Sequence, residues 1–151
     1  MGIKVLVTNR KASHEYEIMD RFEAGIVLVG TEVKSLREGH AVLTDGWVDI
    51  DRGEAYLQDV NISLYSHGNQ MNHVERHPRK LLLKRREIIR LHQKISEKGL
   101  TLIPLKFYLK DQLIKLEIAL AKGKKLHDKR ESQKSRDAAR EIHRAIRNKN
   151  R

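Results

Sequence analysis

Cysteine is absent from the 151 residues, and proline and aromatic residues are scarce. The absence of thiols excludes a disulfide framework and a thiolate zinc site. No apolar run approaches the length of about 20 residues that a membrane-spanning helix needs. Residues 1–11 also lack the apolar stretch and cleavage-site pattern of a signal peptide. The sequence therefore predicts a cytoplasmic protein that does not enter a membrane.

Motifs of catalysis and metal binding are missing as well. There is no nucleophile elbow, no glycine-rich phosphate loop and no paired-histidine metal motif. His73 and His77 would share a helical face, but their segment has the composition of a loop. Asp49 and Asp51 alternate along a predicted strand, where carboxylates usually face solvent. We therefore expect no enzyme activity, no metal site and no cofactor.

Positive charge is in excess, and it is unevenly placed. The net charge is +11. Residues 1–75 hold 7 basic and 12 acidic side chains, whereas residues 76–98 hold 9 and 2, and residues 122–151 hold 12 and 4. A protein with only a solvated basic face would carry its charges more evenly. The segregation therefore indicates a protein that binds a polyanion.

Period-two patterns dominate the first 121 residues. They predict strands at residues 14–18, 26–29, 47–51, 54–65, 105–110 and 114–120. The last two strands are joined through Asp111-Gln112 as a hairpin, and the earlier chain bends at Ala24-Gly25. Residues 32–38 predict a short helix that ends at Gly39, and the apolar residues of 88–95 predict a longer one that ends at Gly99. Residues 67–77 are polar and predict an exposed loop.

Short strands with one intervening helix predict a mostly β fold. We expect a small closed OB-like β-barrel with one or two flanking helices. Closure would leave no edge strand exposed. An open sheet packed by one helix is the alternative. Residues 1–121 would form this RNA-binding domain, and residues 122–151 a basic C-terminal tail.

The tail differs from the domain in composition. It has no aromatic residue, and its one helical stripe is narrow, with only Ala138, Ile142, Ala145 and Ile146. This stripe offers too little apolar area to offset the entropy of ordering. We expect a tail that is disordered when free and helical when bound. Calmodulin-type and membrane-surface helices need larger apolar anchors, so the composition favours nucleic acid.

The densest basic cluster in the domain surrounds a triple leucine. It consists of Arg76, Arg79, Lys80, Lys84, Arg85 and Arg86. Leu81–Leu83 would anchor the segment and hold the charges in place, so that several phosphates could be met at once. A solvated helix start is the alternative, but positive side chains are unfavourable at a helix N-terminus. The residues alone thus predict an RNA- or ribosome-binding domain with a basic tail.

Longer motifs identify a family. The chain resembles the SsrA-binding protein (small protein B) family in these motifs, in order: Asn9-Arg10-Lys11-Ala12 with His14 and Tyr16, Glu23-Ala24-Gly25, Gly30-Thr31-Glu32-Val33-Lys34-Ser35-Leu36-Arg37, Asn72-His73, Arg79-Lys80-Leu81-Leu82-Leu83 with Glu87-Ile88, and Ala121-Lys122-Gly123-Lys124-Lys125 with Asp128-Lys129-Arg130. Lys84 and Glu75 depart from the family pattern, which affects the detail of the 67–77 loop.

The resemblance implies an OB-fold that binds the tRNA-like domain of transfer-messenger RNA (tmRNA). The complex would enter a ribosome stalled without a codon in its decoding site, for peptide tagging and ribosome rescue by trans-translation. The barrel would replace the missing anticodon arm, and the tail would sense the empty mRNA channel. Elongation factor Tu and alanyl-tRNA synthetase would act through the RNA, and the protein would be a monomer. The alternative is a ribosomal structural protein or assembly factor.

The resemblance also implies the residues that contact RNA. In the domain these are His14, Tyr16, Glu32, Lys34, Ser35, Arg37, Asn72, His73, Arg79, Lys80, Leu83 and Lys84. In the tail, the ribosome-binding residues would be Lys122, Gly123, Lys124, Lys125, His127, Asp128, Lys129 and Arg130. Lys and Arg would take phosphates, His and Tyr would stack on bases, and His127 would stack in the decoding site.

Overall fold

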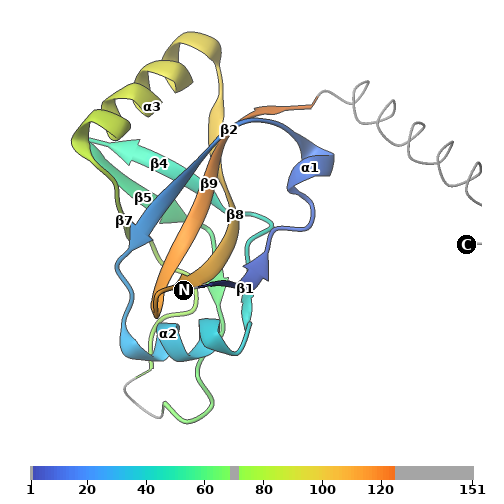
Figure 1. Ribbon diagram of the computed structural model, residues 1–151, viewed down its shortest axis with the longest axis vertical. Helices are drawn as coiled ribbons and strands as arrows, with labels where there is room; N and C mark the ends of the chain where they lie inside the picture. Colours follow the sequence, from blue (N-terminus) through green and yellow to red (C-terminus); the bar gives the residue numbers. More distant parts are fainter. Residues whose placement is uncertain (1, 69–71, 125–151) are drawn as a thin grey trace, which may run out of the picture.

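The computed structural model describes residues 2–68 and 72–124. They form a curved antiparallel sheet with helices at its ends (Figure 1). The strands are β1 (Ile3–Thr8), β2 (Tyr16–Ile26), β3 (Ala41–Val42), β4 (Trp47–Asp51), β5 (Glu54–Gln58), β6 (Asn61–Ile62), β7 (Arg79–Leu82), β8 (Thr101–Lys110) and β9 (Leu113–Gly123). The helices are α1 (Ala12–Glu15), α2 (Gly30–Arg37) and α3 (Arg85–Lys98).

The main sheet has seven strands in the order β1-β8-β9-β2-β7-β5-β4, and β3 pairs with β6 separately. The β8–β9 hairpin turns at Asp111 and Gln112, whose φ angles of 52° and 70° suit a two-residue turn. β2 pairs with β9 along most of its length and changes partner at Gly25, which faces both Lys115 and Leu82. β2 thus connects the two halves of the sheet.

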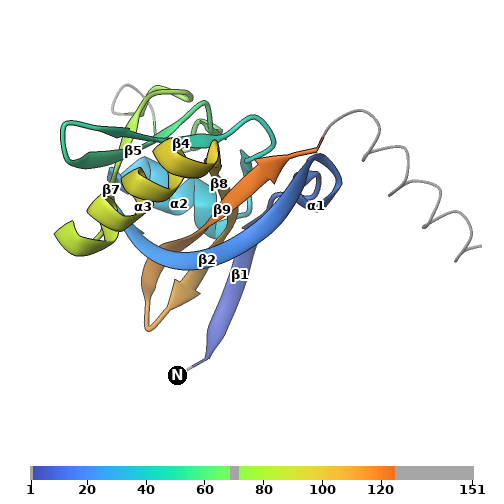
Figure 2. The same cartoon turned by 90° about the horizontal axis from the view of Figure 1, so that it is seen from above.

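The prediction of a closed barrel is wrong for the residues that the structure describes. β1 and β4 are the two edges of the sheet, and no hydrogen-bonded ladder joins them there. β4 lies against β8, but β1 already pairs with the outer edge of β8 from Lys106 to Lys110. The sheet therefore curls without closing, as Figure 2 shows from above. The mostly β class and the open-sheet alternative agree with this arrangement.

Both longer helices begin and end with local signals. The Glu32 carboxylate accepts the Val29 N–H at 3.0 Å in α2, and Glu87 accepts the Lys84 N–H at 2.9 Å in α3. Each bond satisfies one of the free N–H groups at a helix start. The left-handed φ of Gly39, 77°, and of Gly99, 63°, turns the chain after each helix. The predicted helices at 32–38 and 88–95 are confirmed, although α2 begins and ends earlier than predicted and α3 is longer at both ends.

The core occupies the concave side of the sheet. Leu36 of α2 and Leu91 of α3 pack with Leu57, Phe107 and Leu116 from the strands, all fully buried. A smaller cluster under α1 joins Ala12 to strand residues of β8 and β9. No helix among the described residues is long and apolar enough to cross a membrane. These two clusters fix the positions of α1, α2 and α3 around the sheet.

Candidate nucleic-acid interface

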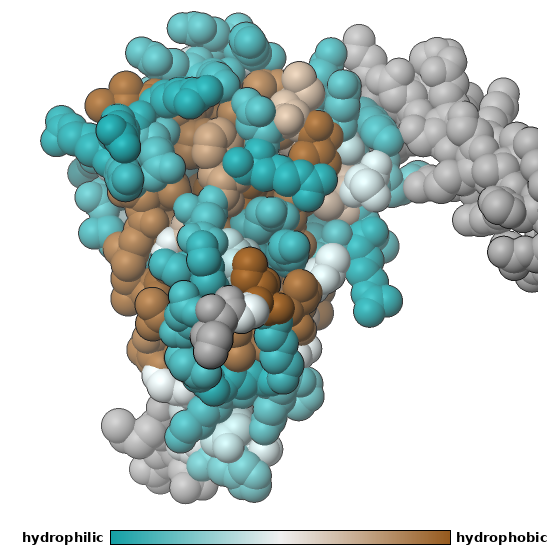
Figure 3. Space-filling model, viewed as in Figure 1, coloured by the Kyte–Doolittle hydropathy of each residue, from teal (hydrophilic) through white to brown (hydrophobic). Residues whose placement is uncertain are grey.

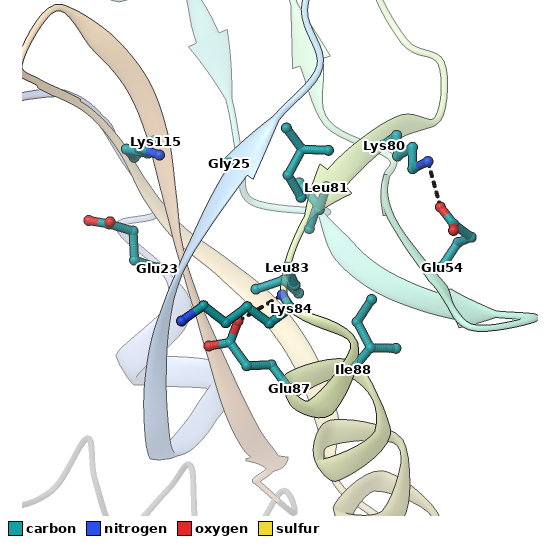
Figure 4. A pocket seen from close by; sticks show the side chains of 11 residues that line it. Glu23, Gly25, Glu54, Lys80, Leu81, Leu83, Lys84, Glu87, Ile88 and Lys115 are labelled. Atoms are coloured by element: carbon teal, nitrogen blue, oxygen red, sulfur yellow. Dashed lines mark hydrogen bonds and ion pairs between the residues drawn. The ribbon is translucent and has the colours of Figure 1, made fainter.

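A groove of about 670 Å³ opens where β2, β7 and the start of α3 meet. Its floor and walls come from Gly25 and from Leu81, Leu82 and Leu83, and Figure 4 shows lysines and glutamates around them. Leu82 remains 54% exposed. Figure 3 shows hydrophobic surface along this side of the molecule, between charged residues. An exposed apolar strip inside a charged rim is typical of a binding surface.

The basic side chains of the rim are Lys80, Lys84 and Lys115. Lys80 binds Glu54 of β5 at 2.7 Å, and this hydrogen bond raises the pKa of Lys80. The ammonium group of Lys84 has no hydrogen bond or ion pair within the described part of the chain. Lys84 directly precedes α3 and Lys115 lies on β9, and both line the groove (Figure 4). A polyanion in the groove would meet positive charge from both side chains.

Glu23 is a fixed anion at the edge of the same groove. The Tyr108 hydroxyl donates to its carboxylate at 2.5 Å, and Lys110 approaches it at 3.3 Å. The bond from Tyr108 and the nearby lysines hold the pKa of Glu23 below its usual range. Burial, together with the bond to Glu23, raises the pKa of Tyr108. Glu23 therefore stays ionised near neutral pH and can accept a hydrogen bond from a bound ligand.

Glu32 and Arg79 form a buried ion pair between α2 and β7. Their side chains are 1% and 0% exposed, and Arg79 Nε donates to Glu32 Oε2. Arg79 Nη1 donates to the Val60 carbonyl at 2.8 Å, and Nη2 to the Glu75 carbonyl at 2.9 Å. His77 Nε2 meets the same Glu32 oxygen at 2.8 Å. We call Glu32, His77 and Arg79 the buried clasp, because they tie α2 to the loop before β7.

The clasp keeps Glu32 ionised despite its burial. Burial raises the pKa of Glu32, but the Val29 N–H, Arg79 and His77 lower it by a larger total, so the pKa lies below the usual value. Arg79 is fully enclosed, so its guanidinium cannot reach a phosphate in this conformation. In this structure Arg79 and Glu32 hold the surrounding loop, and the predicted contact of these two residues with RNA stays a prediction.

Other predicted residues on α2 and the loop divide into buried and exposed groups. Ser35 is buried and donates to the Ser63 carbonyl at 2.7 Å. His73 is buried between Thr31 and the Ile62 carbonyl, so the prediction of an exposed 67–77 loop is wrong at this residue. Asn72 accepts the Tyr65 N–H through Oδ1 and donates to the Tyr65 carbonyl through Nδ2. These three side chains stabilise the loop rather than present themselves to solvent.

Lys34 and Arg37 are the exposed members of the α2 group. The Lys34 ammonium lies over the Tyr65 ring, 5.5 Å from its centroid. This contact places a cation and an aromatic ring side by side on the surface, a combination that suits nucleic acid.

A third group of predicted residues lies at the other end of the sheet. Tyr16 begins β2 directly opposite Gly123 of β9, and Lys122 pairs with Glu17. Lys124 donates its backbone N–H to the Glu15 carbonyl and its ammonium to the Ser13 carbonyl, both at 3.0 Å. His14 of α1 is half-buried beside them. In Figures 1 and 2 this end lies beside α1, away from the groove at the start of α3. The predicted residues therefore do not form one compact face.

Comparison with known proteins shows the family. The model of the SmpB protein family matches residues 6–148. The chain belongs to the SmpB family.

Curated relatives in this family match over nearly their whole length. The SsrA-binding protein of Carboxydothermus hydrogenoformans is 54% identical, covering 95% of this chain and 97% of that protein. The SsrA-binding protein of Pelobacter propionicus is 51% identical, covering 100% and 99%. A chain of the solved structure described as "tmRNA-SmpB: a journey to the center of the bacterial ribosome" is 45% identical, with a TM-score of 0.69 over 82% of this chain and 91% of that one.

The groove contains residues that the sequence alone did not indicate. Glu23, Leu82 and Lys115 lie on β2, β7 and β9 and meet only in the fold. Glu23 and Leu82 stand inside two of the recognised motifs, but those motifs do not indicate which side chains face outward. For Lys115, no local signal separates it from other strand lysines. The predicted tail residues Lys125, His127, Asp128, Lys129 and Arg130 lie outside the described residues.

Proposed function

We propose that this SmpB-family chain binds the tRNA-like domain of tmRNA and delivers it to ribosomes stalled on mRNA that lacks a codon in the A site. The groove between β2, β7 and α3 carries this proposal. It combines exposed apolar surface at Leu82 with lysines from different elements. RNA recognition commonly uses this pairing of phosphate-binding cations with a surface on which an unstacked base can rest.

The groove residues have distinct roles in this proposal. Lys80, Lys84 and Lys115 neutralise phosphates and release counterions. Leu82 and Leu83 pack against an unstacked base or a ribose. Glu23 accepts a hydrogen bond from a base amine or a ribose hydroxyl, because an ionised carboxylate has only acceptors. Tyr108 keeps that carboxylate in place. The protein contributes binding and positioning, and no bond is made or broken by its side chains.

The exposed α2 residues Lys34 and Arg37 extend the RNA surface. The buried clasp, together with Ser35, Asn72 and His73, holds the loop that supports it. These residues therefore act on RNA affinity through the shape of the surface, and their substitution would lower affinity and stability together.

The opposite end of the sheet leads into the tail that serves the ribosome in this proposal. Residues 122–124 lie there beside His14 and Tyr16, which remain candidates for contact with tmRNA. The folded domain takes the place of the missing anticodon arm, and the tail enters the vacant mRNA channel, becoming helical on binding ribosomal RNA. Elongation factor Tu and alanyl-tRNA synthetase act on the same tmRNA. A monomer in the cytoplasm would suffice for this role.

Substitution of one groove lysine tests the proposal. In Lys84→Ala, we expect about five- to tenfold weaker binding of the tRNA-like RNA and a plot of log K against log salt that is flatter by about 0.7–0.9, because one phosphate contact is lost. Lys4→Ala removes the same charge from exposed β1 and should bind within about twofold of the original protein. Both are measured by titration over a salt series. Equal losses for the two variants would contradict the groove assignment.

A further inference from the structure

A second, smaller hollow lies beside the groove, between α3 and the turn that joins β4 to β5. Its volume is about 360 Å³, within the range of about 300–1,000 Å³ that is typical of small-ligand sites. The turn contributes Ile50, Arg52 and Gly53, and α3 contributes Ile88, Ile89 and His92. Figures 1 and 2 both place α3 beside β4 and β5. We call this space the α3 hollow.

The α3 hollow is lined by three isoleucines and by polar side chains that make few contacts within the fold. Ile89 is 49% exposed, although it stands next to the core residue Ile88. His92 and Gln93, which also line it, make no hydrogen bond or ion pair within the described ranges of the chain. Both side chains are exposed, so their polar groups meet water in the free protein and can bind a ligand without breaking a contact of the fold.

The charge around the hollow favours an anionic ligand. Arg52 is 93% exposed, and its ion pair with Asp51 is long at 3.9 Å. Arg85, Ile89 and His92 follow one another at helical spacing, so Arg85 lies on the same face of α3. The nearby Glu54 already binds Lys80. Arg52 thus lines the hollow, Arg85 lies on the same face of α3 one turn before Ile89, and no acidic side chain lines the wall.

The turn itself holds Arg52 in an uncommon conformation. Arg52 has a φ of 53° and Gly53 a φ of 80°, as a two-residue hairpin turn between Asp51 and Glu54 requires. Asn, Asp and Gly adopt the first of these positions with less strain than Arg. The turn therefore does not explain an arginine at position 52. Its guanidinium would instead bind a ligand above α3.

The hollow and the groove are neighbours, because Ile88 lines both. We propose that the α3 hollow holds one unpaired nucleotide of the RNA that occupies the groove. Its base packs on Ile89 and the His92 ring, Gln93 bonds a base edge, and Arg52 and Arg85 bind the flanking phosphates. Aromatic and guanidinium groups are suited to such stacking. This inference rests on the proposed function and extends that RNA surface around the start of α3.

Substitutions that preserve the fold test the phosphate contact. Arg52→Asn removes the guanidinium and introduces a residue that favours the left-handed turn. We expect it to weaken binding of the tRNA-like RNA about tenfold. Arg90→Gln removes the same charge from the outer face of α3 and should leave affinity within about twofold. His92→Phe should retain affinity and His92→Ala lose it, since only the first keeps a ring. Equal affinity of the Arg52 and Arg90 variants would overturn the proposal.

Photo-crosslinking separates this inference from the proposed function. A benzophenone amino acid is placed at Ile89 or at Leu82 of the full chain, and its crosslinks to the tRNA-like RNA are mapped by reverse transcription. The expected result is a crosslink from each position, to different nucleotides, with the Ile89 product at an unpaired base. A crosslink from Leu82 without one from Ile89 overturns the α3 hollow alone. Absence of both crosslinks overturns the groove as well, and with it this inference.

Discussion

Replacement of Arg79 by Ala should lower the free energy of unfolding by about 3–5 kcal/mol. Loss of Arg79 leaves the Glu32 carboxylate buried without its main partner and frees the carbonyls of Val60 and Glu75. Such a loss is a large part of the stability of a small domain, about 5–15 kcal/mol in total. Thermal unfolding followed by circular dichroism should therefore show a midpoint lower by at least roughly 10 °C.

Lys80→Ala is the matched control for this result. Lys80 is the next residue of β7, but it is 46% exposed and pairs with Glu54 at the surface. Exposed ion pairs contribute little because water and salt screen them, so the midpoint should hardly change. The double variant Glu32→Leu, Arg79→Met should be less destabilised than the sum of the two single variants, since no unpaired charge remains buried. A midpoint for Arg79→Ala equal to that of Lys80→Ala would contradict the clasp.

The clasp also predicts the acid side of the stability curve. The folded-state pKa of Glu32 is below its value in the unfolded chain, so the ionised group stabilises the fold above the unfolded value. That contribution disappears as pH falls through the lowered folded pKa. Glu32→Gln should therefore be less stable than the original chain near neutral pH, and the two unfolding midpoints should approach each other in acid.

Truncation after Lys124 should separate RNA binding from ribosome function. The shortened chain keeps β9 and the contacts of Lys124 to Ser13 and Glu15, so the groove and the sheet remain complete. We expect its affinity for the tRNA-like RNA to stay within a few-fold of the full chain. Transfer of the stalled peptide onto tmRNA should be abolished, because the tail that would enter the mRNA channel is gone. Affinity for the tRNA-like RNA is measured by titration, and peptide transfer is measured on ribosomes programmed with truncated messages.

A full-length variant shows whether the tail acts as a helix. In Ile142→Pro, Ile146→Pro the charge is unchanged, but each proline disfavours a helix interior by about 3 kcal/mol. Residues 131–148 would span roughly 27 Å as a helix. The double-proline variant should bind RNA normally and fail in peptide transfer, as the truncated chain does. Full transfer by either protein would mean that the tail has no helical role in the channel.

Local patterns predicted the elements whose signals lie close together in the chain. The apolar spacing in 88–95 with Gly99 indicates α3, and alternation on both sides of Asp111-Gln112 indicates the β8–β9 hairpin. The prediction of a closed barrel was wrong, because alternation reveals that a strand has two faces but not which strands pair with each other. Pairing of β1 with β8 joins the first strand to residues about a hundred positions later, which no local period encodes.

The candidate site was only partly accessible to sequence reasoning for a related reason. Lys80 and Lys84 were found because charge density is a local property. Arg79 belongs to the same basic cluster, but its partner Glu32 lies 47 residues earlier, so burial and pairing become visible only in the fold. The groove likewise assembles Glu23, Leu82 and Lys115 from three strands. The proposed role of the tail in the ribosome depends on residues beyond 124 and stays a prediction.

The central claim, that the groove selects one tRNA-like RNA, is tested most directly by sequencing the RNA that copurifies with the tagged full chain and with its Leu82→Asp variant. Leu82 is exposed, so Asp should spare the fold while placing a negative charge against RNA and removing an apolar contact worth at least about a tenfold change in affinity. The account predicts one abundant tRNA-like RNA with the original chain and its depletion with the variant. Bulk ribosomal RNA recovered equally with both proteins would contradict it and favour a ribosomal structural protein or assembly factor.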